Sequence, residues 1–161
     1  MYASEKLGLR SVEVDLRETV FDMSYDWHGK RLAVVSADRK ITIYNLENDG
    51  KWAKNSEFSA HYGPIWKIKW AHDTLGSVIA TCSFDKKVMV FEENIITVVD
   101  EQGNPTKKST WENKASFFNA QEPTEDLKFG PRSKGLVLAT CSSDGRFYTY
   151  DLRSFQNIKD M

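Results

Sequence analysis

Two cysteines are the first side chains in this sequence that could do covalent chemistry. Cys82 and Cys141 each stand between a threonine and a serine, in short runs that read Thr-Cys-Ser. This shared context predicts equivalent places on two neighbouring sheets, which pack about 10 Å apart. A disulfide requires Cα atoms within about 7 Å of each other. We therefore expect both cysteines to be reduced thiols in the core, as is usual in the cytoplasm or nucleoplasm.

A cysteine nucleophile would also need a histidine base close by. The sequence has three histidines, and all fall in expected turns without a repeated relation to the cysteines: His28, His61 and His72. We therefore expect no catalytic residue. The sequence also has no glycine-rich phosphate loop, no Cys-x-x-Cys pair and no His-Glu-x-x-His motif, so we expect no cofactor and no metal.

Three aspartates could in principle form a carboxylate cluster for a metal ion or for acid catalysis. Asp38, Asp85 and Asp144 are separated by 47 and 59 residues, and each follows a serine by two residues. An aspartate at a corner between two strands accepts hydrogen bonds from the exposed amides of the turn. One aspartate per repeated unit spreads the carboxylates around a rim, so we interpret them as residues that close turns.

The aspartates belong to a frame that occurs three times with identical internal spacing. In each copy a glycine is followed by alanine, serine, aspartate and an aromatic residue, at steps of four, three, two and six positions. The copies are Gly29, Ala33, Ser36, Asp38 and Tyr44; Gly76, Ala80, Ser83, Asp85 and Phe91; and Gly135, Ala139, Ser142, Asp144 and Tyr150. The spacing approaches the roughly 40–45 residues of a WD-type propeller blade with loop insertions. The frame therefore predicts a β-propeller.

His61 precedes the second copy, at the place where WD blades often bond a histidine to the corner aspartate, here Asp85. Ser83 is a candidate third member of this network, although Phe91 replaces the tryptophan that usually completes it. A catalytic base is the alternative. We favour the structural role.

Runs of β-branched and aromatic residues surround each corner aspartate, as is typical of strands. In the second copy they are Ile65–Trp70, Val78–Cys82 and Val88–Phe91. Trp66 and Trp70, interleaved with lysines, could form a platform for base stacking. They are four residues apart with Ile68 between them, which predicts one shared core face instead. The pattern favours an all-β fold of antiparallel meanders.

The frame also predicts how the chain is divided. Residues 1–19 form the N-terminal strand of an incomplete or shared blade, and 20–60 form blade 1. Residues 61–123 form blade 2 with a long loop insertion, and 124–161 form an incomplete blade 3. Residues 92–123 are expected to be the longest irregular region, in which Ile95–Val99 either extends a strand or forms a short ribbon. Trp111 and the pair Phe117-Phe118 return to the sheet as its outer strand.

Composition and charge exclude several classes of function. The chain has 161 residues and a formal net charge of −1, without the clustered basic face of a nucleic-acid binder. The doublets Lys86-Lys87 and Lys107-Lys108 have acidic neighbours and are interpreted as solvated. No apolar run approaches the roughly 20 residues of a membrane helix, and the N-terminus lacks the apolar core of a secretion signal. We expect a soluble intracellular protein that binds no nucleic acid and does not insert into a membrane.

Propellers usually close with four to eight blades, so about three blades leave two open faces. Contiguous apolar faces of this kind bind a partner or aggregate. The pattern therefore indicates either part of a longer propeller or a subunit that requires a partner.

Several stretches of the second and third copies carry a more specific resemblance. Ile65–His72, followed by Ile79–Asp85, resembles the second blade of two sister families: the Seh-type nucleoporins of the Y-shaped nuclear-pore scaffold and the Sec-thirteen-type propellers of the COPII coat. Lys128–Pro131 and Gly135–Gly145 resemble the Seh type more closely, as do Trp111 and the tail Asp151–Phe155. The similarity covers roughly residues 18–155, and the chain looks like the N-terminal half of such a protein.

This resemblance implies about three blades of an open six-bladed propeller whose missing blade is donated by an α-helical scaffold nucleoporin. It implies other Y-complex subunits as further partners, a place at the nuclear pore and envelope, and a role in nucleocytoplasmic transport, including mRNA export and protein import. It also implies a place in a lysosomal or vacuolar complex that regulates TOR signalling. Insertion beside the first blade makes six residues the candidate contacts with the partner: Val12, Val14, Leu16, Val20, Phe21 and Met23. A COPII coat subunit and a peptide-reading WD propeller are the alternatives.

Overall fold

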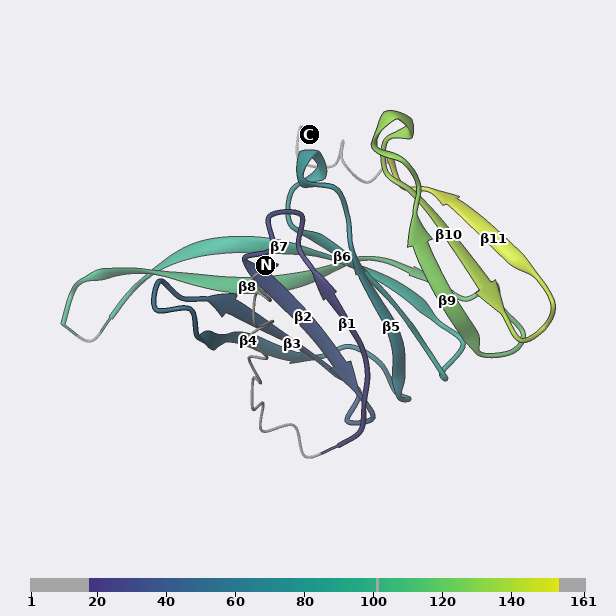
Figure 1. The fold of residues 1–161 in the computed structure, drawn as a ribbon, viewed down its shortest axis with the longest axis horizontal. Coiled ribbons are helices and arrows are strands. Elements are labelled where there is room, and N and C mark those ends of the chain that lie inside the picture. The colour runs from purple at the N-terminus through teal and green to yellow at the C-terminus, as the bar shows by residue number, and fades with distance from the viewer. Residues whose placement is uncertain (1–17, 101, 154–161) are drawn as a thin grey trace, which may run out of the picture.

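The structure is a computed structural model in which residues 18–100 and 102–153 are described. These residues form eleven strands in three antiparallel sheets, together with two short 3-10 helices, η1 (Asp73–Leu75) and η2 (Arg132–Lys134). The sheets stand side by side, with the second between the first and the third (Figure 1). The prediction of an all-β fold built from propeller blades is confirmed.

The first sheet is a four-stranded meander in which each strand pairs with the next along the chain. Its strands are β1 (Val20–Tyr25), β2 (Arg31–Ser36), β3 (Lys40–Leu46) and β4 (Trp52–Ser59). The β3–β4 turn contains Asn48-Asp49-Gly50, where Gly50 has a φ of 80° that only glycine adopts without strain. Short polar turns of this kind leave only neighbouring strands within pairing distance, which produces the meander.

The second sheet repeats this order and the third has one strand fewer. The second contains β5 (Ile65–Trp70), β6 (Val78–Ser83), β7 (Val88–Val99) and β8 (Pro105–Phe117). The third contains β9 (Thr124–Phe129), β10 (Val137–Ser142) and β11 (Phe147–Asp151). All six residues of β6 are buried, because this strand has a packed sheet on each of its two faces.

The irregular region predicted for residues 92–123 is wrong for most of its length. Strands β7 and β8 pair continuously from Val88 to Val99 and form a long hairpin that extends well beyond the sheets (Figure 1). Ile95–Val99 therefore extends a strand, which was one of the two expected alternatives. The β-branched residues favour this extended ribbon. The Asp100 carboxylate closes its turn by accepting hydrogen bonds from the amides of Gln102 at 2.9 Å and Asn104 at 2.8 Å.

A β-bulge occurs at the same place in the first strand of each sheet. The pairing register shifts by one residue at Phe21 in β1, at Trp66 in β5 and at Glu125 in β9. The extra residue changes which side chains share a face. Ile65 and Ile68 are therefore both fully buried, and Trp66 instead contacts Phe84. The prediction that Trp66 and Trp70 share one core face is wrong for Trp66, because sequence spacing does not reveal a bulge.

Each of the two gaps between sheets contains its own hydrophobic core. The core between the first and second sheets consists of Ala33, Val35, Ile41, Ile43, Ile65, Ile68, Ile79, Met89 and Phe91. The core between the second and third sheets consists of Ala71, Val78, Ala80, Cys82, Val88, Val90, Ala115, Leu127, Leu136, Leu138 and Leu152. Burial of one such branched side chain contributes about 1.5–3 kcal/mol, so these cores hold the sheets together.

Candidate functional site

The corner between β6 and β7 holds the densest polar network of the expected site residues. The Nδ1 atom of His61 lies 3.0 Å from both carboxylate oxygens of Asp85. The same carboxylate accepts backbone hydrogen bonds from Tyr62 and Lys87, each at 3.0 Å. Burial raises the pKa of Asp85, but the His61 hydrogen bond and these amides outweigh it, so the pKa lies below its ordinary value.

Ser83 lies beside this network without touching the histidine. Its hydroxyl donates to the carbonyl of Pro64 at 2.8 Å and accepts the backbone amide of Asp85 at 3.1 Å. The second hydrogen-bond partner of the histidine ring is Thr81, whose hydroxyl lies 2.9 Å from His61 Nε2. Thr81 was missed by the sequence interpretation. The sequence could have indicated Thr81, because it lies two residues before Ser83 on the same predicted strand and therefore on the same face.

The corner aspartates of the other two copies close their turns with different partners. The Asp38 carboxylate accepts the Ser36 hydroxyl at 2.6 Å and the Lys40 amide at 3.0 Å. The Asp144 carboxylate accepts the amides of Gln121 and Arg146, each at 3.0 Å. The three carboxylates lie on three different sheets. No group of three or more acidic, histidine or cysteine side chains among the described residues could hold a metal ion.

A buried ion pair joins the first sheet to the second. Arg31, at the start of β2, makes two hydrogen bonds to the Glu93 carboxylate, at 2.6 and 2.8 Å. The side chain of Glu93 is only 5% exposed, and Ser109 donates to it at 2.5 Å. The Arg31 guanidinium also lies 5.0 Å from the centre of the Trp70 ring. This pair connects residues that are 62 positions apart, and sequence spacing gave no signal for it.

Three of the six candidate partner contacts lie on β1, at the edge of the first sheet. Val20 is 40%, Phe21 42% and Met23 54% exposed, so three neighbouring apolar side chains of this strand reach the surface. Asp22, by contrast, is directed to the second sheet, where it accepts the Ile68 amide at 3.1 Å. Since side chains alternate along a strand, Met23 lies on the opposite face. The other candidates, Val12, Val14 and Leu16, lie outside the described residues.

The sequence is similar to a known protein family and to several known proteins. Residues 52–92 match the family described as WD domain, G-beta repeat. Nucleoporin SEH1 of Danio rerio is 33% identical over 149 residues, which are 92% of this chain and 40% of that protein. Nucleoporin SEH1 of Bos taurus and that of Homo sapiens are each 33% identical over 150 residues, which are 92% of this chain and 41% of those proteins. The resemblance to the Seh-type WD-repeat nucleoporins is confirmed.

The region of similarity to the Seh-type nucleoporins includes the corner network and the inter-sheet ion pair. The chain spans about 40% of the length of the curated relatives it matches. No helix among the described residues is long and apolar enough to cross a membrane.

The two cysteines occupy different environments, although their sequence contexts match. Cys82 is fully buried, and burial strongly raises the pKa of its thiol. Cys141 is exposed, so the prediction that both are core thiols is wrong for this residue. Its neighbours Leu138 and Thr140 face the second sheet, whereas Cys141 lies on the opposite face of β10 with Ala139. The burial of equivalent positions thus depends on whether a further sheet covers them.

Proposed function

We propose that this chain is a non-catalytic scaffold component of the nuclear pore complex, in its Y-shaped outer ring. The observation that carries the proposal is the similarity to proteins named Nucleoporin SEH1 over 92% of the chain. In this role the chain supports nucleocytoplasmic transport, including mRNA export and protein import, by holding other subunits in place.

The partner that we propose is an α-helical nucleoporin that donates a blade to an open six-bladed propeller. The exposed edge of the first sheet supports this arrangement. Met23 and Tyr25 lie on the face of β1 away from the second sheet and are 54% and 58% exposed. A donated strand would pair with backbone groups at a free edge, while its side chains cover apolar residues of this kind. Val12, Val14 and Leu16 precede β1 and belong to the same proposed contact.

The state of the reactive side chains supports a role without catalysis. The side chains of His61 and Thr81 are fully buried, so a substrate could not reach the hydroxyl that lies beside His61 Nε2. The thiol of Cys82 is buried and has a raised pKa, which keeps it protonated and inaccessible. These groups stabilise the fold.

The relatives' names favour the nuclear pore over the alternatives. A COPII coat subunit would have a similar blade sequence, but the three relatives described above are named as nucleoporins. The lysosomal or vacuolar TOR complex that the resemblance implied gains no support from these names. We therefore restrict the proposal to the pore.

The proposal is tested in cells by tagging the endogenous protein. We expect fluorescence at the nuclear rim and co-purification of a helical nucleoporin with other subunits of the outer ring. Met23→Asp places a charge on the proposed contact face and should abolish co-purification without changing the melting temperature. Ile95→Asp is the control, since Ile95 is 65% exposed on the distal β7–β8 hairpin. Diffuse fluorescence of the wild type, or equal co-purification with both variants, would contradict the proposal.

A further inference from the structure

The distal half of the β7–β8 hairpin is a two-stranded ribbon that projects away from the sheets (Figure 1). Strand β6 pairs with β7 only as far as Glu92, and just beyond it the Ser77 carbonyl accepts the Glu93 amide at 2.9 Å. From Ile95 to Val99 the strand pairs with β8 alone among the described strands. Isolated two-stranded ribbons are marginally stable in water. This part of the hairpin would therefore gain from pairing with a further strand.

The two edges of the ribbon differ in composition. The β7 edge, Ile95–Val99, contains no charge and no proline, and its four apolar side chains are between 38% and 67% exposed. The β8 edge carries Pro105, Lys107 and Lys108. Proline and lysine are residues by which proteins discourage the pairing of an edge strand with another chain. The β8 edge is therefore protected, whereas the β7 edge is open.

The backbone of the open edge presents its polar groups at alternate residues. The Glu93 amide bonds on the side of β6, and the Asp100 amide bonds across the hairpin, each at 2.9 Å. The amide and carbonyl of one residue point to the same side of an antiparallel strand, and this side alternates along the chain. Those of Ile95, Thr97 and Val99 therefore point away from β8. No strand in the described part of the chain pairs with them.

The open edge is complementary to itself about Thr97. When a second copy lies antiparallel with its Thr97 opposite this one, Ile95 faces Val99 and Ile96 faces Val98 of the second copy. The outward residues then form three opposed pairs, and each pair exchanges two backbone hydrogen bonds. Branched apolar side chains face one another across the strands, which stabilises a sheet. A shift by one residue would set outward groups against inward ones, and a shift by two would lose one of the three pairs.

We propose that two copies of this chain associate through Ile95–Val99, paired antiparallel about a two-fold axis at Thr97. The two hairpins then form one sheet of four strands in the order β8-β7-β7-β8. Its outer edges are the two β8 strands with their proline and lysines, so association ends at the dimer. Because the paired segment is short, the dimer is weak and depends on concentration. This contact goes beyond the scaffold role and does not involve β1.

Sedimentation velocity of the purified chain, from micromolar to sub-millimolar concentrations, measures the association. We expect a monomer–dimer equilibrium for the wild type. Thr97→Pro removes the central outward amide of both copies and should weaken the dimer about tenfold or more. Lys107→Pro is the matched control. Lys107 lies opposite Thr97 on β8, its amide points to the other edge, and the variant should dimerise like the wild type.

A cysteine at the proposed two-fold axis tests the register. Thr97→Cys in a Cys141→Ser background places two thiols opposite each other, with Cα atoms about 5.5 Å apart, which a disulfide can bridge. Mild oxidation should link the two copies, and reduction should separate them. Lys107→Cys in the same background is the control, because it lies on the far edge and should link much more slowly. Cys82 is buried and does not compete.

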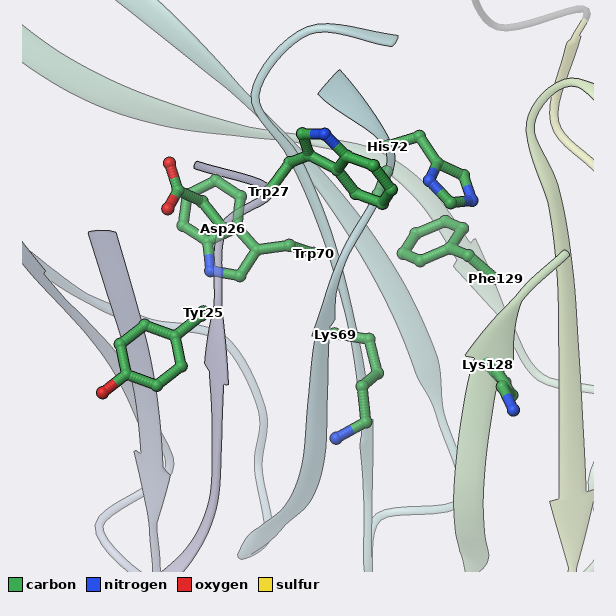
Figure 2. A pocket seen from close by; sticks show the side chains of 9 residues that line it. Tyr25, Asp26, Trp27, Lys69, Trp70, His72, Lys128 and Phe129 are labelled. Atoms are coloured by element: carbon green, nitrogen blue, oxygen red, sulfur yellow. The ribbon is translucent and has the colours of Figure 1, made fainter. Parts of the chain in front are cut away.

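A further control addresses non-specific association of exposed apolar side chains. Trp27 is 58% exposed and lines a pocket at the ends of β1, β5 and β9 (Figure 2). No residue of the β7–β8 hairpin lines this pocket. Trp27→Ala should therefore dimerise like the wild type.

Three outcomes would overturn the proposal: a monomeric wild type at every concentration, equal association of Thr97→Pro and the wild type, or equal cross-linking of Thr97→Cys and Lys107→Cys. Circular dichroism shows whether each variant is folded. The Thr97 amide makes no bond within the hairpin, so a folded Thr97→Pro is expected. If this variant does not fold, the cross-linking of Thr97→Cys decides.

The dimer and the scaffold role fail separately. Met23→Asp, which should abolish co-purification of the helical nucleoporin, should leave the dimer unchanged. Ile95→Asp should weaken the dimer and leave that co-purification intact. Loss of the dimer alone would thus contradict only the pairing of the hairpins.

Discussion

His61 is bonded through Nδ1 to both carboxylate oxygens of Asp85, at 3.0 Å each, across 24 residues of sequence. Since the carboxylate only accepts, Nδ1 of the ring is the donor, and Nε2 lies 2.9 Å from the Thr81 hydroxyl. The segment before β5 is thereby fixed to the corner after β6. Among the described corners, that of Asp144 shows the same fold without this link, because Ala120 occupies the place of the histidine.

His61→Ala should lower the free energy of unfolding by about 2 kcal/mol, because it removes the buried imidazole that contacts both Thr81 and Asp85. Urea denaturation followed by tryptophan fluorescence measures this change. His28→Ala is the control, because His28 is exposed in a turn and should alter stability by less than about 0.5 kcal/mol. Equal effects of the two substitutions would show that the network does not stabilise the corner.

Two carboxylates should make the protein sensitive to acid. Burial raises the pKa of Glu93, but hydrogen bonds from Arg31 and Ser109 outweigh it, and the pKa of Glu93, like that of Asp85, is lowered. A pKa lower in the folded than in the unfolded state stabilises the protein above the unfolded values, near 3.9 for Asp and 4.3 for Glu. This stabilisation is lost as the pH falls through the lower, folded values.

The measurement is the free energy of unfolding as a function of pH. Asp85→Asn and Glu93→Gln should each be less stable than the wild type at neutral pH. Their deficit should shrink as the pH falls below about 4, because the wild-type groups then become protonated too. A deficit that stays constant down to the acid transition would contradict the assignment.

A double-mutant cycle tests the ion pair between the first two sheets. Arg31→Met and Glu93→Met should each cost about 3 kcal/mol, because each leaves a buried charge without its partner. The double variant should cost less than the sum of the two. The surface pair Lys40–Glu57, whose side chains are 42% and 29% exposed, is the control and should show a coupling below about 1 kcal/mol. Additive effects at Arg31 and Glu93 would refute the coupling.

The residue after each corner aspartate has a left-handed backbone. Arg39 has a φ of 69°, Lys86 of 68° and Gly145 of 76°. Gly145→Ala should destabilise the protein by about 1 kcal/mol, because alanine is strained at this φ. A steric clash would not contribute, since an added Cβ would meet no atom within 4 Å. Arg39→Ala keeps an L-residue at the same φ and should be nearly neutral. Thermal unfolding of the two variants compares them, and a neutral Gly145→Ala would show that the turn relaxes.

The two cysteines should react at different rates with a mild alkylating reagent. Iodoacetamide should modify the exposed Cys141 in the folded protein and reach the buried Cys82 only on unfolding. Mass spectrometry after partial labelling measures both rates. Cys141→Ser should remove all labelling under native conditions. Rapid modification of Cys82 would instead indicate an activated thiol and revive an enzymatic function.

The first two sheets show how local sequence predicts topology. Alternating apolar residues and short polar turns bring only neighbouring strands together, so the repeat frame was sufficient for the meander order. The frame also placed His61 upstream of Asp85, and the structure brings the two side chains together. It could not predict the hairpin of residues 88–117 beyond its first half, because polar Glu112 and Asn113 resemble a loop in composition, although they pair with β7 as part of a strand.

The sequence alone determined the number of sheets and the closing of their corners, because these depend on contacts between residues close along the chain. Only the tertiary structure decided which equivalent residues of the three sheets differ in their contacts and burial. Arg31 meets Glu93, and Cys141 is exposed while Cys82 is buried. Both findings depend on what a neighbouring sheet supplies, and the packing of one sheet on another is a long-range property that no local repeat encodes.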